Sequence, residues 1–150
     1  MPTFMKNLNV TARCANQFRA DKLAEVGLSG CQHSYIINIC NNPGISQDAL
    51  SKKLYINKSN VARQLSILEE NGFIERKQST EDKRNMLVFP TEKAKQALPV
   101  VIKVLREWSS YLSEGFTEEE IRKFTEMMDK ISEKAQAYVA GKESSHEDSV

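Results

Sequence analysis

The spacing of apolar residues along the chain predicts mostly helices. Only four prolines and six glycines interrupt the 150 residues. The long stretches between them carry apolar side chains three or four residues apart, which is the period of one helix face. The first predicted helix covers residues 4–25, and the second begins near Ser29 and ends at the turn-forming "NNPG" of residues 41–44. We therefore expect a mainly α protein.

Two short helices with a tight link follow. Ser46 and Asn57 are each placed to cap a helix, and the apolar positions of the second helix, Val61, Leu65 and Leu68, repeat with helical spacing. Little more than "YI" lies between the two helices. Because so short a connection makes the second helix cross the first at a steep angle, this stretch is a helix-turn-helix candidate.

The outward face of that second helix carries side chains that can bind DNA bases and phosphates. At about 100° per residue, its first half turns polar and basic residues away from the apolar stripe, namely Lys58, Ser59, Asn60, Arg63 and Gln64. Arginine can hold guanine with two hydrogen bonds, asparagine or glutamine can hold adenine in the same way, and serine and lysine can hold phosphates. We predict these residues and Gln47 as DNA contacts; the alternative is a solvated face with no ligand.

After "NGF" at residues 71–73 the period changes from 3.6 to 2, which predicts strands. Ile74, Arg76 and Gln78 fall on one face of the first strand, and "STEDKRN" separates it from the apolar run "MLVF". A charged β-hairpin directly behind a helix-turn-helix is a wing, whose tip can lie along DNA.

The tip of this wing has mixed charge. Lys83 and Arg84 would reach phosphates or the narrow minor groove. Asp82 would order the turn by accepting backbone hydrogen bonds or by pairing with the arginine. The alternative is a charged, soluble hairpin tip and nothing more.

Two long helices are predicted after the hairpin. From Thr91 onward the apolar positions alternate spacings of four and three, the pattern of a helix packed along another. Thr117 and Glu120 form a capping box for the last helix. Residues 141–150 are polar enough to predict a disordered tail.

Taken together, "SQDALSKKL" and "NKSNVARQLSILEENGFIERKQSTEDKRNMLVFPTEKA" resemble the MarR family of winged-helix transcriptional regulators. The most specific parts are the "LEENGFIER" junction, the D-x-R of the wing and the helix start at "TEK". By position, the resemblance implies recognition contacts at Ser59, Asn60 and Arg63, a wing arginine at Arg84 and a wing-ordering role for Asp82.

Three positions depart from the family pattern. Asn57 stands where an aspartate is usual, an exchange that keeps an N-cap. Ile67 occupies a place that is often basic, so one phosphate contact is missing. Pro90 should shorten the second wing strand, because proline donates no ladder hydrogen bond.

The resemblance implies one MarR-type domain over residues 1–150. Its winged helix-turn-helix part covers residues 28–91, and residues 1–27 and 92–140 supply dimerisation helices. A two-fold dimer places two recognition helices about one DNA turn, roughly 34 Å, apart and fits a pseudo-palindromic operator. Without the resemblance, packing of the same apolar stripes within one chain explains them equally well.

The charge distribution agrees with a DNA partner better than the net charge does. The formal net charge is only +1, but Lys52 to Arg84 contains eight basic and five acidic residues, whereas residues 114–150 contain five basic and ten acidic ones. The basic surplus therefore coincides with the predicted DNA contacts. No apolar run suits a membrane helix and the N-terminus lacks a signal peptide, so we expect a cytoplasmic protein with no membrane partner.

The cysteines bear on regulation. Cys14, Cys31 and Cys40 show no C-x-x-C spacing, which predicts reduced thiols and no metal site. The resemblance implies release from DNA by a small, often aromatic, effector or by cysteine oxidation. Cys31 and Cys14 are the candidate thiol sensors, with buried packing as the alternative role for each.

The residues and the resemblance together predict a sequence-specific regulator of transcription that binds double-stranded DNA, and the resemblance implies a homodimer that acts as a repressor. The alternative is a winged-helix module that binds a protein and no longer binds DNA, which the near-neutral charge and Ile67 favour. The chain has no Gly-rich phosphate loop and no G-x-S-x-G elbow, so neither an enzyme nor a cofactor is expected.

Overall fold

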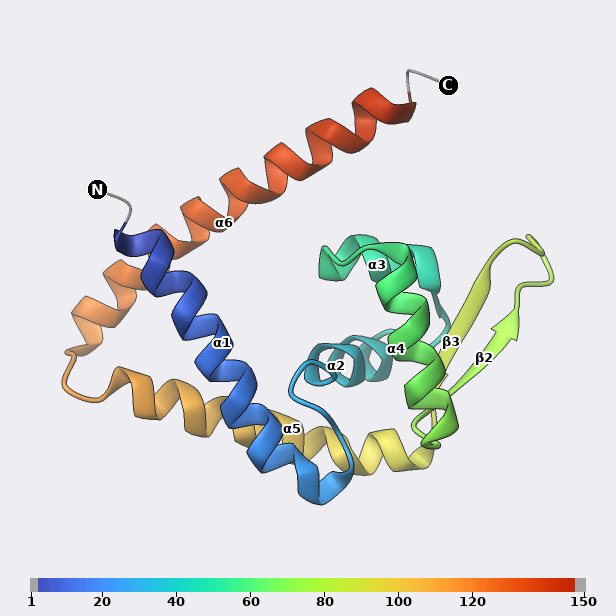
Figure 1. The fold of residues 1–150 in the computed structure, drawn as a ribbon, viewed down its shortest axis with the longest axis horizontal. Coiled ribbons are helices and arrows are strands. Elements are labelled where there is room, and N and C mark those ends of the chain that lie inside the picture. The colour runs from blue at the N-terminus through green and yellow to red at the C-terminus, as the bar shows by residue number, and fades with distance from the viewer. Residues whose placement is uncertain (1–2, 148–150) are drawn as a thin grey trace. The chain divides into compact units, whose positions relative to one another are not determined.

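The computed structural model describes residues 3–147, with side chains described as far as Lys142, and most of these residues are helical (Figure 1). The predicted class, mainly α with a small β-hairpin wing, is confirmed. The elements in chain order are α1 (Thr3–Leu23), the 3-10 helix η1 (Ala24–Val26), α2 (His33–Asn41), β1 (Ile45–Ser46), α3 (Gln47–Leu54), α4 (Lys58–Glu70), β2 (Ile74–Gln78), β3 (Met86–Pro90), α5 (Glu92–Ser113) and α6 (Glu118–Glu147).

The chain forms two compact units, and the boundary lies between Ser109 and Ser110, inside α5. The first unit contains the winged part together with α1 and most of α5. The second contains the end of α5 and α6.

The predicted helix caps of the helix-turn-helix are confirmed. The Ser46 hydroxyl accepts a hydrogen bond from the Ala49 N–H at 3.1 Å, and Asn57 Oδ1 accepts one from the Asn60 N–H at 2.8 Å. Each bond satisfies a donor that a helix start leaves free. The predicted start of α2 at Ser29 is wrong, because the Ser29 N–H and carbonyl both bond to Gln32 and form a turn before the helix.

The sheet has three antiparallel strands in the order β1-β3-β2. The wing register pairs Ile74 with Pro90 and Gln78 with Met86, while the short β1 pairs Ile45 with Val88. The strand β1 was not predicted. The expected shortening of β3 is wrong, because β3 pairs with β2 along the full length of β2, Pro90 included, and the following Thr91 N–H still bonds to the Phe73 carbonyl at 2.9 Å.

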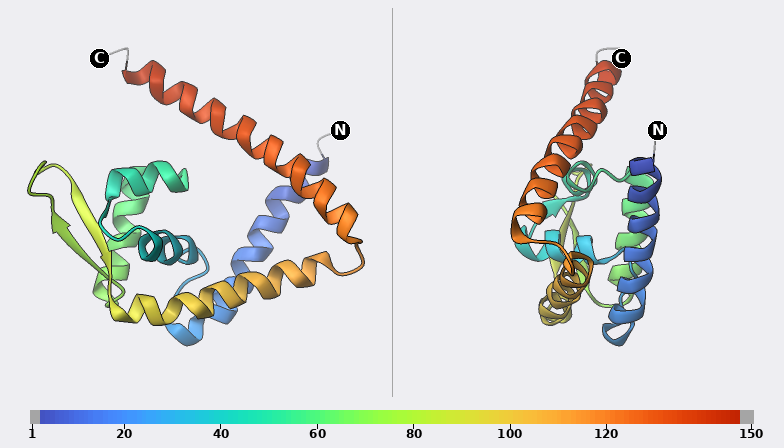
Figure 2. Two further views of the ribbon diagram at one scale, coloured as in Figure 1. Left: turned by 180° about the vertical axis from the view of Figure 1, so that it is seen from behind. Right: turned by 90° about the vertical axis from the view of Figure 1, so that its left-hand side faces the viewer.

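One apolar core in the first unit holds the winged part together. Residues from α1, α2, α3, α4, both wing strands and α5 are buried in it. The predicted inward positions of α4 are among them, with Val61, Leu65 and Leu68 all at or below 1% exposure. The wing projects beyond the helices α2, α3 and α4 in both Figure 1 and the left view of Figure 2.

In the second unit, the capping box at the start of α6 is confirmed. The Thr117 N–H donates to Glu120 Oε2 at 2.9 Å and the Glu120 N–H donates to Thr117 Oγ1 at 3.1 Å. The helix continues through Glu147, although the composition predicted disorder from residue 141. Extending an existing helix adds one hydrogen bond for each residue fixed, and no proline stops it here. Residues 148–150 of that predicted tail lie outside the described residues.

Candidate nucleic-acid interface

The N-terminal half of α4 presents a polar and basic surface. Lys58, Ser59 and Arg63 are exposed, and Asn60 is half-buried. Since the buried residues of α4 fall on the opposite stripe, the predicted outward face is confirmed for these residues.

The side chains on this face are arranged before any ligand binds. Arg63 Nη2 donates to Asn60 Oδ1 at 2.9 Å, and Ser59 Oγ donates to the capping Asn57 Oδ1 at 3.1 Å. The bond uses one lone pair of the Asn60 oxygen and leaves the Asn60 NH₂ group as a donor. An amide donor beside an arginine suits acceptor atoms of base edges such as guanine O6 and N7.

Gln64 differs from the prediction, which turned it outward. It is half-buried, and its Oε1 accepts a hydrogen bond at 3.2 Å from Gln32 Nε2, whose residue is buried at the start of α2. At 100° per residue, position 64 lies between the outward Arg63 and the buried Leu65, so a long side chain there can turn either way. Gln64 therefore fixes α4 on α2.

Lys58 pairs loosely with the first turn of α3. Its Nζ lies 3.7 Å from Asp48 Oδ2, and both side chains are more than half exposed. An exposed ion pair contributes little to stability, so the ammonium can exchange the carboxylate for a phosphate.

The wing tip is an ordered turn. Ser79 N–H donates to the Asn85 carbonyl at 2.8 Å and Gln78 Nε2 donates to the Lys83 carbonyl at 2.6 Å. Asp82 Oδ1 accepts from the Arg84 N–H at 3.1 Å. Gln78 and Ser79 thus help to hold the tip, a role that sequence analysis missed. Lys83 and Arg84 are exposed.

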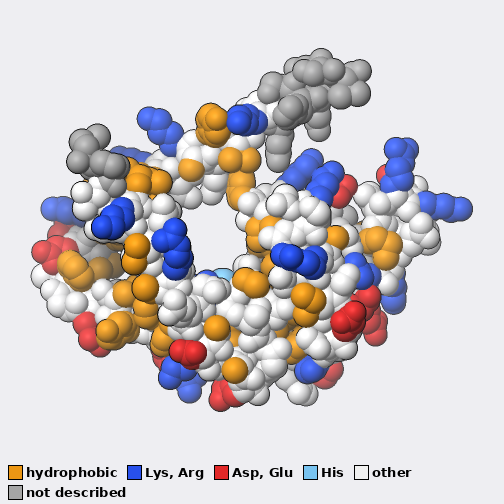
Figure 3. All heavy atoms as spheres, viewed as in Figure 1, with side chains coloured by type: hydrophobic (Ala, Val, Ile, Leu, Met, Phe, Trp, Pro, Cys, Tyr) orange, Lys and Arg blue, Asp and Glu red, His pale blue; other side chains and the backbone are white. Residues whose placement is uncertain are grey.

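The polar and basic surface at the start of α4 and the wing tip lie at the same end of the first unit. In Figure 1 the start of α4, next to α3, and the turn between β2 and β3 are both at that end. Figure 3 shows Lys and Arg side chains gathered over α3 and the wing tip. The arrangement gives a cationic surface interrupted by hydrogen-bonding side chains.

Arg76 is a second group that sequence analysis missed. It lies in the middle of β2, and its Nη2 donates to Glu69 Oε1 at 3.1 Å and to Ser66 Oγ at 3.2 Å, both on α4. The side-chain hydrogen bond from Arg76 holds the pKa of Glu69 below its ordinary value. The available signal was a charged residue on the same strand face as the buried Ile74, since an inward charge needs a partner.

The candidate thiol sensors are both accessible in the single chain. Cys14 and Cys31 are exposed and unpaired with another cysteine, so buried packing within the chain is wrong for both. Cys14 lies on the outer side of α1, next to the inward Ala15, and Cys31 lies in the turn before α2, where its Sγ is 3.3 Å from Ser29 Oγ.

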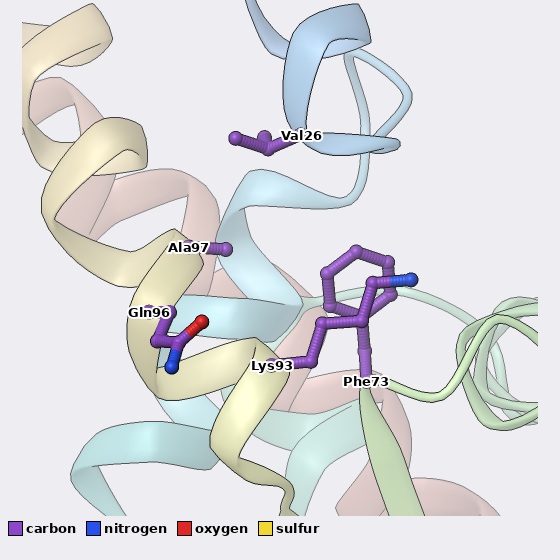
Figure 4. A pocket seen from close by; sticks show the side chains of 5 residues that line it. All are labelled: Val26, Phe73, Lys93, Gln96 and Ala97. Atoms are coloured by element: carbon purple, nitrogen blue, oxygen red, sulfur yellow. The ribbon is translucent and has the colours of Figure 1, made fainter.

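One pocket of about 310 Å³ lies beside the start of α5, lined by Val26, Phe73, Lys93, Gln96 and Ala97 (Figure 4). Lys93 Nζ sits 4.4 Å from the centroid of the Phe73 ring and donates to the Asn71 carbonyl at 2.7 Å. The pocket therefore combines an aromatic wall with a cation.

A helix-turn-helix whose second helix leads into a cation-tipped antiparallel hairpin defines a winged helix-turn-helix protein. The sequence model of the MarR family matches residues 28–86. A putative MarR family transcriptional regulator from Listeria monocytogenes, solved in complex with a 26mer DNA, is 33% identical, with 89% of each chain covered and a TM-score of 0.82. This chain belongs to the MarR family of transcriptional regulators.

Two further relatives agree with this placement. An uncharacterised HTH-type transcriptional regulator of Bacillus subtilis strain 168, YybA, is 25% identical over 131 residues, which is 87% of each chain. The crystal structure of a MarR transcriptional regulator from Methanosarcina mazei Go1 is 26% identical, covers 90% of this chain and 97% of that one, and has a TM-score of 0.85.

Within residues 3–147 the structure has no helix with the length and apolarity of a membrane span.

Proposed function

We propose that this chain regulates transcription by binding double-stranded DNA sequence-specifically as a homodimer. The observation that carries the proposal is the position of two exposed groups in one compact unit: the start of α4, with Ser59 and Arg63, and the wing tip, with Arg84, lie at the same end (Figure 1). The DNA complex of the Listeria monocytogenes relative supports this proposal.

The two groups have different tasks in this proposal. The start of α4 enters the major groove, where Arg63 and Asn60 contact base edges and Lys58 and Ser59 contact phosphates. The wing follows the backbone, where Lys83 meets phosphates and Arg84 reaches the minor groove, whose negative potential favours arginine.

Dimerisation is supported by apolar side chains that a single chain leaves in water. On α1 the exposed residues include Phe4, Met5, Leu8 and Val10, and on α6 they include Phe124, Met127, Ile131 and Tyr138. Stripes of this size usually mark an interface. Sedimentation equilibrium should give twice the chain mass, and a monomer at micromolar concentration would contradict this part of the proposal.

The proposed mode of control is repression that a small aromatic effector or thiol oxidation relieves. The pocket at Phe73 and Lys93 offers an ammonium group for the carboxylate of an effector, and the exposure of Cys31 and Cys14 permits oxidation. Benzoate and hydrogen peroxide should each be titrated into the protein–DNA complex, with Lys93→Ala and the Cys31→Ser and Cys14→Ser variants as tests of the two routes.

The main experiment is a fluorescence-anisotropy titration of the gene's own promoter DNA at several salt concentrations. Arg63→Ala and Arg84→Ala should each weaken binding by about 1–3 kcal/mol, and affinity should fall steeply with salt. Lys103→Ala on α5 removes an exposed positive charge away from the proposed surface and is the matched control. Salt-insensitive binding, or equal losses in the control, would favour a protein partner instead.

A further inference from the structure

Arg76 joins three elements of the proposed interface through one guanidinium. Besides its bonds to Ser66 and Glu69 on α4, its Nη1 donates to Gln47 Oε1, at the first residue of α3, at 3.1 Å. Its own N–H donates to Glu69 Oε2 at 3.0 Å. The start of α3, the second half of α4 and the wing strand β2 therefore meet at this one side chain.

The contact with Arg76 decides which way the Gln47 amide points. A guanidinium has only donors, so only the amide oxygen can face it. The Gln47 NH₂ group is left as a donor, and no acceptor within the described part of the chain binds it. A hydrogen bond from a charged donor is stronger than one from a neutral donor, so the bond from Arg76 opposes rotation of the Gln47 amide.

The environment of that NH₂ group favours an anion. Gln47 is half-buried at the N-terminus of α3, next to the capping Ser46, where helix N–H groups and the helix dipole attract negative charge. The DNA backbone supplies phosphate oxygens, which accept hydrogen bonds and carry the charge.

The contacts of Arg76 fix the positions of its partner side chains more than they stabilise the folded chain. The side chain is 19% exposed, and its Nε is buried with no partner among the described residues. A buried donor left unpaired lowers stability, and an ion pair whose carboxylate is 40% exposed contributes little to it. The planar guanidinium of an arginine can donate to Gln47, Ser66 and Glu69 at the same time. The ammonium of a lysine lacks this fixed, branched geometry.

We infer that Arg76 is a positioning residue for DNA recognition, which holds the Gln47 amide with its NH₂ group aimed at a backbone phosphate. This inference rests on the proposed DNA-binding function. Arg76 acts through Gln47 and does not itself touch the duplex.

A double-mutant cycle on promoter affinity tests the inference in the full chain. Gln47→Ala and Arg76→Lys should each weaken binding about fivefold, the usual effect of one hydrogen bond. The double variant should be no more than about twofold weaker than either single variant, because both remove the same phosphate contact. If the two losses multiply, or if Arg76→Lys binds as wild type does, the inference is wrong.

Glu69→Gln is the matched control, because it removes the charged partner of Arg76 but leaves the Gln47 bond in place. It should lower the free energy of unfolding and keep promoter affinity within about twofold. The Gln47 side-chain amide signals in ¹⁵N NMR should move in Arg76→Lys and stay in Glu69→Gln, a readout that a merely stabilising arginine would not give.

The same titrations distinguish a failure of the proposed function from a failure of the inference about Arg76. If wild type binds no promoter DNA, the proposed function fails and the inference fails with it. If wild type binds and Arg63→Ala weakens it, the proposed function holds, and the cycle alone decides the role of Arg76.

Discussion

Asp82 Oδ1 accepts a hydrogen bond from the backbone N–H of Arg84 at 3.1 Å and lies 3.7 Å from the Nε of the same arginine. The Arg84 side chain is 94% exposed, so its ion pair with the carboxylate contributes little. Of these two contacts, the backbone bond is therefore the one that helps to order the wing tip, and the guanidinium remains available to a ligand.

Two substitutions at Asp82 should change DNA affinity in opposite directions. Asp82→Asn keeps an oxygen that can accept the Arg84 N–H and removes a negative charge near the proposed phosphate path, so affinity should rise about two- to threefold. Asp82→Ala removes the acceptor as well, so the tip loosens and affinity should fall about threefold despite the lost charge. Anisotropy titration with promoter DNA measures both. If both variants bind more tightly than wild type, Asp82 acts only through its charge.

Much of the fold could be predicted because its signals are local. The caps at Ser46, Asn57 and Thr117 depend on residues three positions apart, and the apolar period of α4 needs only the helix itself. The strand β1 could not be predicted from its own sequence. It is two residues long, and it is a strand only because Ile45 meets Val88, far along the chain.

The site was predicted less completely, for the same physical reason. Exposure of Lys58, Ser59 and Arg63 follows from helical geometry. The contacts of Gln47 and Gln64 depend on Arg76 and Gln32, which other elements supply. A polar residue at the margin of a helix face has no preferred partner in its own sequence, so its orientation appears only when the elements are packed.

The turn between α3 and α4 contains a strained residue. Tyr55 has φ 56° and ψ 39°, and the residue is 53% exposed. A left-handed conformation costs a non-glycine residue about 1–2 kcal/mol, and glycine is the usual choice at this position after a helix. Glycine removes this strain but gains conformational entropy in the unfolded chain, which offsets part of the gain. Tyr55→Gly should therefore raise the free energy of unfolding by about 0.5–1 kcal/mol. Urea unfolding measures this, and a destabilised variant would mean that the ring packs more favourably than its exposure indicates.

Gly30 lets the loop before α2 approach α1 closely. A Cβ at this position would overlap the Asn16 carbonyl oxygen and lie 2.8 Å from Asn16 Oδ1. The Gly30 carbonyl also accepts a hydrogen bond from Arg19 Nε at 2.8 Å, so the two segments cannot separate freely. Gly30→Ala should therefore lower the midpoint of thermal unfolding, with a cost of about 1–3 kcal/mol.

Gly141 is the matched control for Gly30. It lies in α6, and nothing comes within 4 Å of a Cβ placed there. Gly141→Ala should stabilise the helix by up to about 1 kcal/mol, because alanine is the better helix former. Equal effects of the two alanine substitutions would show that crowding at Asn16 is not the cause.

The Glu69–Arg76 pair makes stability depend on pH in a defined direction. The hydrogen bond from Arg76 lowers the pKa of Glu69 below its ordinary value of 4.5. The stabilisation is therefore fully present above about pH 4.5 and is lost as the pH falls through the lowered pKa of the folded state. Glu69→Gln should be less stable than wild type at pH 7, and the difference should shrink as the pH falls below about 4.5.

Urea unfolding of wild type and Glu69→Gln across this pH range measures the difference. Because the Glu69 side chain is 40% exposed, solvent screens the pair and the difference at pH 7 should be modest. A difference that stays constant as the pH falls through the lowered pKa of Glu69 would mean that the substitution acts through lost packing, because only the loss of a charge interaction disappears when the carboxylate is protonated.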